Sequence, residues 1–277
     1  MLLTGAPAFF FLIHAPRAAR MSDGAIPAAT LVVMRERGEG PPELLMVERT
    51  ARMAFAGGAM VFPGGRIDEG DRELAAAFAE PDADARIAAI RETLEETGIA
   101  VGIAPDVDHA LAARLQRELH EDIRFGELLT LNGLTLGLDA LTPFARWKPA
   151  FHQARIFDTL FFLAEAPHGD WMPTPQAGEC EAVEWLSAAD VLGRVGRGEA
   201  SAIFPTLRNL ERLARFASIA AARADAAAHP VETITPWIAD HDGEPHLFIP
   251  EGLGYPVTRE PLESVRRGVG EGIFPAA

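Results

Sequence analysis

A dense cluster of charge between Arg91 and Ile99 holds the side chains in this sequence best suited to chemistry. The segment reads Arg-Glu-Thr-Leu-Glu-Glu-Thr-Gly-Ile. On a helix of about 3.6 residues per turn, one side carries an apolar stripe, made of Ile87, Ile90 and Leu94. The opposite side carries three carboxylates: Glu92, Glu95 and Glu96. We therefore expect one face to pack on a core and the other to gather negative charge.

Three carboxylates at one helix end favour a bound cation over the alternative of a solvated acidic face. Glu92 and Glu96 repel each other at i,i+4, which destabilises a helix by about 0.2–0.5 kcal/mol. Glu95 and Glu96 lie in the last turn, where the helix dipole disfavours anions by about 0.3–1 kcal/mol. Both penalties change sign when a divalent cation binds the carboxylate oxygens. Arg91 precedes Glu92 directly and Glu95 by one helical turn, so it is placed to orient a carboxylate.

A glycine turn lies upstream of this helix, in Phe62-Pro63-Gly64-Gly65, and its backbone can approach a ligand closely. The turn and the helix together resemble the Nudix box, G-x5-E-x7-R-E-U-x-E-E-x-G-U, where U is aliphatic. Gly65 matches the opening glycine, and the segment from Arg91 to Ile99 matches the helical half, with Thr93 as an imperfect U. Asp71 stands where the pattern has its first glutamate. Nineteen residues separate Asp71 from Arg91 instead of seven, which predicts an insertion around Leu74 to Asp82 and leaves the role of Asp71 open.

The Nudix resemblance implies a hydrolase of nucleoside diphosphates linked to another group, with Mg²⁺ or Mn²⁺ as cofactor. The implied metal ligands are the Gly65 carbonyl oxygen, Glu92, Glu95 and Glu96. The implied role of Arg91 is to fix a glutamate by an ion pair, and Glu95 is a candidate for the general base. Glu179 and Glu181, in a loop before an expected strand, are alternatives for the base or for a further ligand.

Within this family the chain is similar to the acyl-CoA diphosphatase branch with an interrupted box, over roughly residues 28–215. The shared features include Leu44-Leu45, Arg49, Leu141-Thr142-Pro143 and the segment from Arg155 to Phe162. Met46 and Thr50 depart from the Thr and Ser that this branch usually shows. The favoured substrate is therefore CoA or an acyl-CoA, with Arg49 and Arg155 as phosphate-binding residues. Three aromatic residues are candidates for an adenine or acyl pocket or, alternatively, for the core: Trp147, Phe151 and Phe157. His152 is a candidate base or ligand, with a structural role as the alternative.

Two other functions stay open at this point. One is hydrolysis of ADP-ribose, a nucleotide sugar or a dinucleotide. The other is a non-catalytic Nudix-fold sensor that binds a nucleotide without turnover, although such a binder would not need Glu92, Glu95 and Glu96 together.

Composition narrows the class of partner. The chain has 277 residues, a formal net charge of −15 and a sequence pI near 5.0. This acidic balance argues against binding to nucleic acid or to an anionic membrane. It does not exclude the small nucleotide-type substrate that the resemblance implies, provided that a bound cation and local arginines offset the negative field. The single cysteine, Cys180, cannot form an internal disulfide, which favours a cytoplasmic protein.

The elements that must position the helix indicate an α/β fold. Short apolar runs predict strands at residues 29–34, 43–48, 59–62, 157–163 and 182–186. Helical patterns cover residues 84–97, much of 110–140, and 205–228, and a hairpin is expected around Asp242-Gly243. We expect a Nudix-type α/β/α sandwich around a mixed sheet, with extra helices. Residues 1–24 are interpreted as a disordered tail or a mis-assigned start, and residues 25–228 as the Nudix hydrolase domain that the resemblance implies. Residues 229–277 are interpreted as an extension packed on the same domain, where it acts as a lid, a homodimer contact or both.

Overall fold

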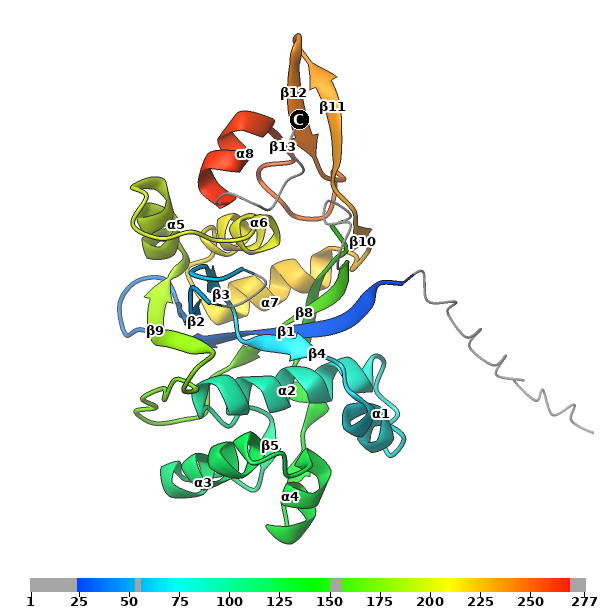
Figure 1. Cartoon of the computed structure of the whole chain (residues 1–277), viewed down its shortest axis with the longest axis vertical. Helices are drawn as coiled ribbons and strands as arrows, with labels where there is room; N and C mark the ends of the chain where they lie inside the picture. The colour runs from blue at the N-terminus through cyan, green and yellow to red at the C-terminus, as the bar shows by residue number, and fades with distance from the viewer. Residues whose placement is uncertain (1–23, 53–55, 150–155, 270–277) are drawn as a thin grey trace, which may run out of the picture.

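The centre of the protein is one mixed sheet (Figure 1). The structure is a computed structural model that describes residues 24–52, 56–149 and 156–269. Eight strands form the sheet: β1 (Ile26–Arg35), β2 (Glu43–Arg49), β3 (Met60–Val61), β4 (Gly64–Arg66), β7 (Thr142–Trp147), β8 (Phe157–Glu165), β9 (Cys180–Ser187) and β10 (Thr233–Ile234). β1 runs parallel to β8 and antiparallel to β2 and β4. The glycine turn therefore continues into β4, beside the central strand.

Helices cover both faces of the sheet. One layer holds α1 (Glu69–Ala75), α2 (Ala83–Thr97), α3 (His109–His120) and α4 (Phe125–Leu131), and the other holds α5 (Ala188–Gly196), α6 (Phe204–Leu213) and α7 (Ile219–Ala228). β1 shows why two layers are needed, because its successive side chains point to opposite faces. Leu31 and Val33 pack in the core under α2, whereas Val32 and Met34 pack in the core under α6. The expected α/β/α sandwich is confirmed.

Two helix predictions need correction. The stretch 205–228 is not one helix, because α6 ends at Leu213 and Ser218 starts α7 by accepting a hydrogen bond from the backbone N–H of Ala221. An alanine-rich composition hides such a cap. The stretch 110–140 holds α3 and α4, but then a short strand β6 (Thr135–Leu136), paired with β5 (Ile103–Ala104), and a 3₁₀ turn η1 (Leu138–Ala140). Gly133, with φ of 62°, separates α4 from that strand.

The C-terminal extension forms a small second sheet of three strands, β11 (Trp237–His241), β12 (Glu244–Phe248) and β13 (Arg259–Pro261), followed by α8 (Leu262–Val269). The expected hairpin is present, and Asp242 and Gly243 both adopt positive φ, as a tight two-residue turn requires. Leu247 and Val265 bury their side chains in the same core as α6. We propose that this extension and residues 25–228 fold as one unit. None of the helices in the described ranges has the length and apolar character needed to cross a membrane.

Arg86 ties the start of α2 to the segment after α4. It is buried, and its guanidinium donates hydrogen bonds to the carbonyl oxygens of Pro81, Leu138 and Leu141. It also lies 5.0 Å from the Phe162 ring centroid. One buried cation therefore donates to three carbonyls from separate points of the chain, although the Leu138 carbonyl oxygen also accepts a hydrogen bond from the Leu141 N–H.

We expect Arg86→Met to lower the free energy of unfolding by about 2–4 kcal/mol, because it leaves buried carbonyl groups without donors. Urea denaturation followed by circular dichroism measures this change. The control is Arg197→Met, which removes an exposed pair with Glu199 and should change the free energy by less than about 0.5 kcal/mol. Equal effects of the two variants would contradict this role for Arg86.

Candidate functional site

The apolar stripe of α2 faces the sheet, and three glutamates lie on the opposite side of the helix. Ile87, Ile90 and Leu94 are fully buried, as the helical spacing predicted. Gly98 ends the helix in the left-handed conformation, with its N–H bonded to the Leu94 carbonyl oxygen. The other face is not solvated as on an ordinary surface helix. It borders a cavity that is lined by Glu92, Glu95 and Glu96.

Arg91 is the centre of an ion-pair network at this face. Its guanidinium forms a two-point contact with Asp71, at 3.0 and 2.9 Å. It also reaches Glu92 Oε1 at 2.9 Å, Glu95 Oε2 at 3.4 Å and the Arg66 carbonyl oxygen at 3.0 Å. Burial by itself would lower the pKa of Arg91. Hydrogen bonding to Asp71 and the negative charge of Glu92 outweigh this effect and raise the pKa, so Arg91 stays cationic.

Asp71 binds Arg91 and does not line the cavity. It is 1% exposed and forms a reciprocal capping box with Asp68 at the start of α1. The longer spacing between the two halves of the motif is accommodated by α1 and the loop to α2, which bring Asp71 back beside the helix. The open question about this aspartate therefore receives a geometric answer: it holds the arginine that contacts two of the glutamates.

Glu96 and Glu92 carry unusual acidities. Burial, reinforced by the neighbouring charge of Glu92, raises the pKa of Glu96 from 4.5 to about 8. Burial likewise raises the pKa of Glu92 to about 7, although Arg91 opposes the shift. Glu96 accepts a 3.0 Å hydrogen bond from the Gly64 N–H and lies 3.8 Å from Arg49 Nη1. The protein supplies too little positive charge to keep both carboxyls ionised at neutral pH.

The glycine turn presses its backbone against these carboxylates. A Cβ on Gly65 would lie 2.3 Å from the Glu92 carboxyl carbon, closer than real contacts allow. Gly64 has φ of 156°, and a Cβ there would lie 2.4 Å from the Ala29 carbonyl oxygen. Gly64 therefore has to be glycine, because the clash there is with backbone, whereas a side chain at position 65 would have to displace the Glu92 carboxylate.

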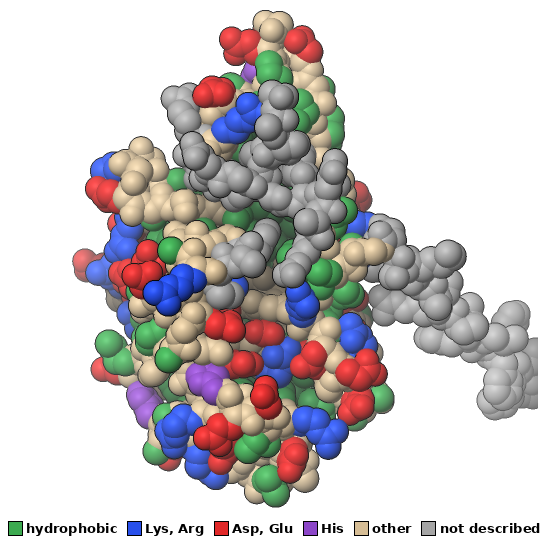
Figure 2. All heavy atoms as spheres, viewed as in Figure 1, with side chains coloured by type: hydrophobic (Ala, Val, Ile, Leu, Met, Phe, Trp, Pro, Cys, Tyr) green, Lys and Arg blue, Asp and Glu red, His purple; other side chains and the backbone are tan. Residues whose placement is uncertain are grey.

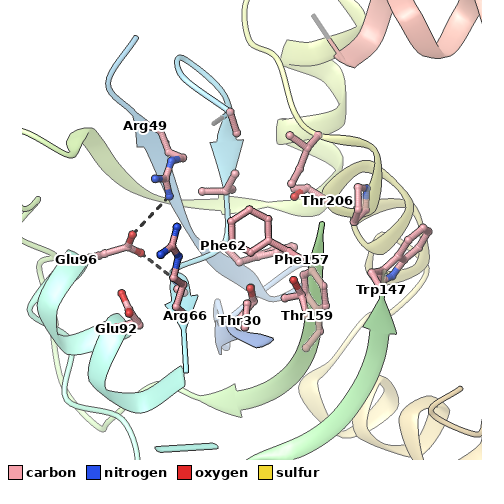
Figure 3. A pocket seen from close by; sticks show the side chains of 18 of the residues that line it. Thr30, Arg49, Phe62, Arg66, Glu92, Glu96, Trp147, Phe157, Thr159 and Thr206 are labelled. Atoms are coloured by element: carbon pink, nitrogen blue, oxygen red, sulfur yellow. Dashed lines mark hydrogen bonds and ion pairs between the residues drawn. The ribbon is translucent and has the colours of Figure 1, made fainter. Parts of the chain in front are cut away.

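The cavity has a volume of ≈ 560 Å³ and two chemically different ends (Figure 3). Arg49, Arg66, Glu92 and Glu96 lie toward one end, whereas Trp147 and Thr206 lie on the opposite side. The aromatic rings of Phe62 and Phe157 and the hydroxyls of Thr30 and Thr159 lie between the two ends. The space-filling view shows acidic and basic side chains gathered at a hollow in the middle of this face (Figure 2).

The residues predicted from the sequence meet in this cavity where they are described. Gly65, Arg91, Glu92, Glu95, Glu96 and Arg49 line it, together with Trp147, Phe157 and Glu179. Glu181 does not line it. Arg155, Phe151 and His152 lie outside the described residues. Arg66 and Thr206 also line the cavity and were not predicted. The position of Arg66 directly after Gly65 is a signal that could have identified it, whereas α6 supplies Thr206 only through tertiary packing.

The donor chemistry fits a hard divalent cation, although the carboxylates are held by the protein itself. In the part of the chain that the structure describes, no three acidic, histidine or cysteine side chains already form a cluster able to hold a metal ion. Arg91 binds oxygens of Glu92 and Glu95, and the Gly64 N–H binds an oxygen of Glu96. Buried carboxyls with raised pKa values beside an open glycine backbone nevertheless provide the oxygen ligands that Mg²⁺ and Mn²⁺ prefer.

Comparison with known proteins agrees with this geometry. The NUDIX domain model matches residues 25–205. A crystal structure of a Nudix hydrolase from Alicyclobacillus acidocaldarius is 31% identical, covers 72% of this chain and 96% of its own, and superposes with a TM-score of 0.66. The Nudix domain of Shewanella oneidensis NrtR, solved with ADP ribose, is 16% identical over 69% of this chain and 86% of its own, with a TM-score of 0.41.

The raised pKa values predict that the metal-free protein loses stability as pH rises. Below pH 4.5 folded and unfolded chains both hold the Glu96 proton, and up to about pH 8 only the folded chain keeps it. The associated stability is therefore lost between these values. We expect Glu96→Gln to become more stable relative to the wild type as pH rises from 5 to 9 in EDTA, measured by urea denaturation. A difference independent of pH would contradict the shift.

The close approach of Gly65 predicts a separate effect on metal binding. Gly65→Ala should fold with a free energy of unfolding within about 1 kcal/mol of the wild type, because the Glu92 side chain can move. Its Mg²⁺ affinity, measured by calorimetry, should fall by about tenfold or more, because the carboxylate is displaced. Gly38→Ala, where an added Cβ meets nothing within 4 Å, is the control. Unchanged affinity in Gly65→Ala would remove this glycine from the metal site.

Proposed function

The chain belongs to the Nudix family and is a Nudix hydrolase, and from this premise we propose that it cleaves the pyrophosphate bond of CoA or an acyl-CoA. The products would be 4′-phosphopantetheine, or its acyl derivative, and 3′,5′-ADP. The observation that carries the proposal is the crowding of Glu92, Glu95 and Glu96 along one side of a cavity whose far side is aromatic.

The proposed metal ligands are the Gly65 carbonyl oxygen, Glu92, Glu95 and Glu96. Their support is the burial of these carboxyl groups beside one another, since burial first and the neighbouring carboxylates second raise the pKa values of Glu92 and Glu96. Bound Mg²⁺ or Mn²⁺ supplies neutralisation of the pyrophosphate charge and a lowered pKa for the attacking water. Arg91 positions Glu92 through a contact of 2.9 Å and Glu95 through a longer contact of 3.4 Å. Asp71 in turn keeps Arg91 in place.

Glu95 is the proposed general base. Its side chain is 23% exposed, compared with 17% for Glu92 and 4% for Glu96, so it has the best access to water. Burial raises the pKa of Glu95 above its ordinary value, although Arg91 opposes this, and a base of raised pKa accepts a proton better at neutral pH. Glu95 takes the proton from water as the water oxygen bonds to phosphorus, and the bond from phosphorus to the bridging oxygen breaks. The leaving phosphate carries away that electron pair.

The substrate class is supported by the two ends of the cavity. Arg49 and Arg66 flank the glutamates and offer guanidinium groups to phosphates. Arg155 stays a predicted second phosphate contact. The aromatic end offers apolar surface to the pantetheine or acyl part, and ≈ 560 Å³ lies within the usual range for a small-molecule site. ADP-ribose, a nucleotide sugar or a dinucleotide is the alternative substrate, and a non-catalytic sensor is the alternative of another class.

A substrate panel with Mg²⁺ tests the proposal. The wild type should hydrolyse CoA or an acyl-CoA with a higher kcat/KM than ADP-ribose, a nucleotide sugar or a dinucleotide, with products measured by chromatography. Glu96→Gln should lose activity by about 10²-fold or more. Glu127→Gln, on the exposed face of α4, should retain it.

The outcomes separate the parts of the proposal. Preference for ADP-ribose would overturn only the CoA assignment. Full activity in Glu96→Gln would overturn the metal ligands. Tight binding of CoA without any turnover, in the presence of Mg²⁺ or Mn²⁺, would favour the sensor.

A further inference from the structure

The Trp147 end of the cavity is linked to the C-terminal extension through a buried chain of hydrogen bonds. Trp147 Nε1–H donates to the Tyr255 hydroxyl at 3.0 Å. The same hydroxyl donates to Asn209 Oδ1 on α6 at 2.8 Å. Trp147 and Asn209 are fully buried and Tyr255 is almost so. Tyr255 therefore links a cavity wall in β7 to α6, from a segment far along the chain.

Ring packing holds the same three elements together. The Trp147 and Tyr255 rings meet edge to face, 5.5 Å apart, and Trp147 packs in the same way on Phe204 at 5.9 Å. Arg212 on α6 lies 5.4 Å from the Tyr255 ring centroid. The Trp147 indole is thus held by edge-to-face contacts with the rings of Tyr255 and Phe204 and by the hydrogen bond of its N–H. Together these contacts fix its orientation at the cavity end.

Gly254 explains how the extension reaches this position. It has φ of 87°, and a Cβ there would lie 2.7 Å from Arg212 Nε. Arg212 itself is anchored by Asp225, 2.7 Å away. The chain can pass this close to α6 only at a glycine, and the next residue is Tyr255. Tyr255 lies beyond residue 205, where the family match ends.

We propose that Tyr255 is a positioning residue that fixes Trp147 at the end of the cavity opposite the glutamates and so determines which acyl groups the enzyme accepts. The proposal rests on the CoA assignment above for its substrate. The catalytic glutamates lie on the opposite side of the cavity from Trp147 (Figure 3). Tyr255 should therefore influence recognition of the part of the substrate remote from the pyrophosphate, and leave bond cleavage unchanged.

The test is Tyr255→Phe, which removes the hydroxyl and keeps the ring. The ratio of kcat/KM for decanoyl-CoA and acetyl-CoA should move toward one by roughly three- to tenfold, the effect expected from one hydrogen bond. The change should lie in KM, with kcat held within about twofold. A wild type that does not distinguish these substrates, or an unchanged ratio in the variant, would overturn the proposal.

A double-mutant cycle separates positioning from loss of stability. Trp147→Phe and Tyr255→Phe remove the same hydrogen bond, so the double variant should change the ratio no more than the larger single variant does. Val265→Ala, in the buried part of α8, should lower the melting temperature without changing the ratio. Independent, additive effects of the two variants, or a ratio change in Val265→Ala, would count against Tyr255 acting through Trp147.

Nuclear magnetic resonance tests the proposal even if CoA is not the substrate. The indole N–H signal of Trp147, assigned by its loss in Trp147→Phe, should shift in Tyr255→Phe. It should also shift when decanoyl-CoA, or ADP-ribose if the panel favours it, is added to metal-free wild type. A signal unmoved by either probe would overturn the role of Trp147 at the cavity end, whatever the panel shows.

Discussion

Crowding of carboxylates at the end of one buried helix is the constraint on which the rest of this structure depends. Glu92, Glu95 and Glu96 share about one turn of α2, and burial raises the free energy of their ionised forms. The protein offsets part of this cost with two arginines, Arg91 and Arg49, and one backbone N–H. The part that remains supports the proposal that a divalent cation binds beside these carboxylates.

Contacts at both ends of α2 and along its apolar face hold the crowded helix end in place. The apolar face of α2 packs on the sheet, and Arg86 joins its start to the segment around η1. Near its end, Asp71 on α1 holds Arg91 with two hydrogen bonds. The loop between Asp71 and α2 can therefore lengthen without moving the glutamates, because the ion pair and not the chain length sets their position.

The cavity is lined almost entirely by residues of the family match, but one of its walls is supported from outside that match. Its charged end comes from β4 and α2, inside the matched region. Its aromatic end includes Trp147, which is held by Tyr255 from the extension, beyond the match. A wall that is supported separately from the charged end would let recognition change while the chemistry is retained.

The sequence by itself determined the local features. The 3.6-residue spacing of Ile87, Ile90 and Leu94 predicted the buried stripe of α2, because periodicity records burial directly, and the apolar run at residues 29–34 predicted a strand. Gly65 and Arg49 were also identified from the sequence, and both line the cavity. Only the tertiary structure decided that Asp71 pairs with Arg91, that residues 205–228 form two helices, and that Tyr255 reaches Trp147. Such contacts join residues far apart in the chain, and the packing that brings them together leaves no periodic pattern in the sequence.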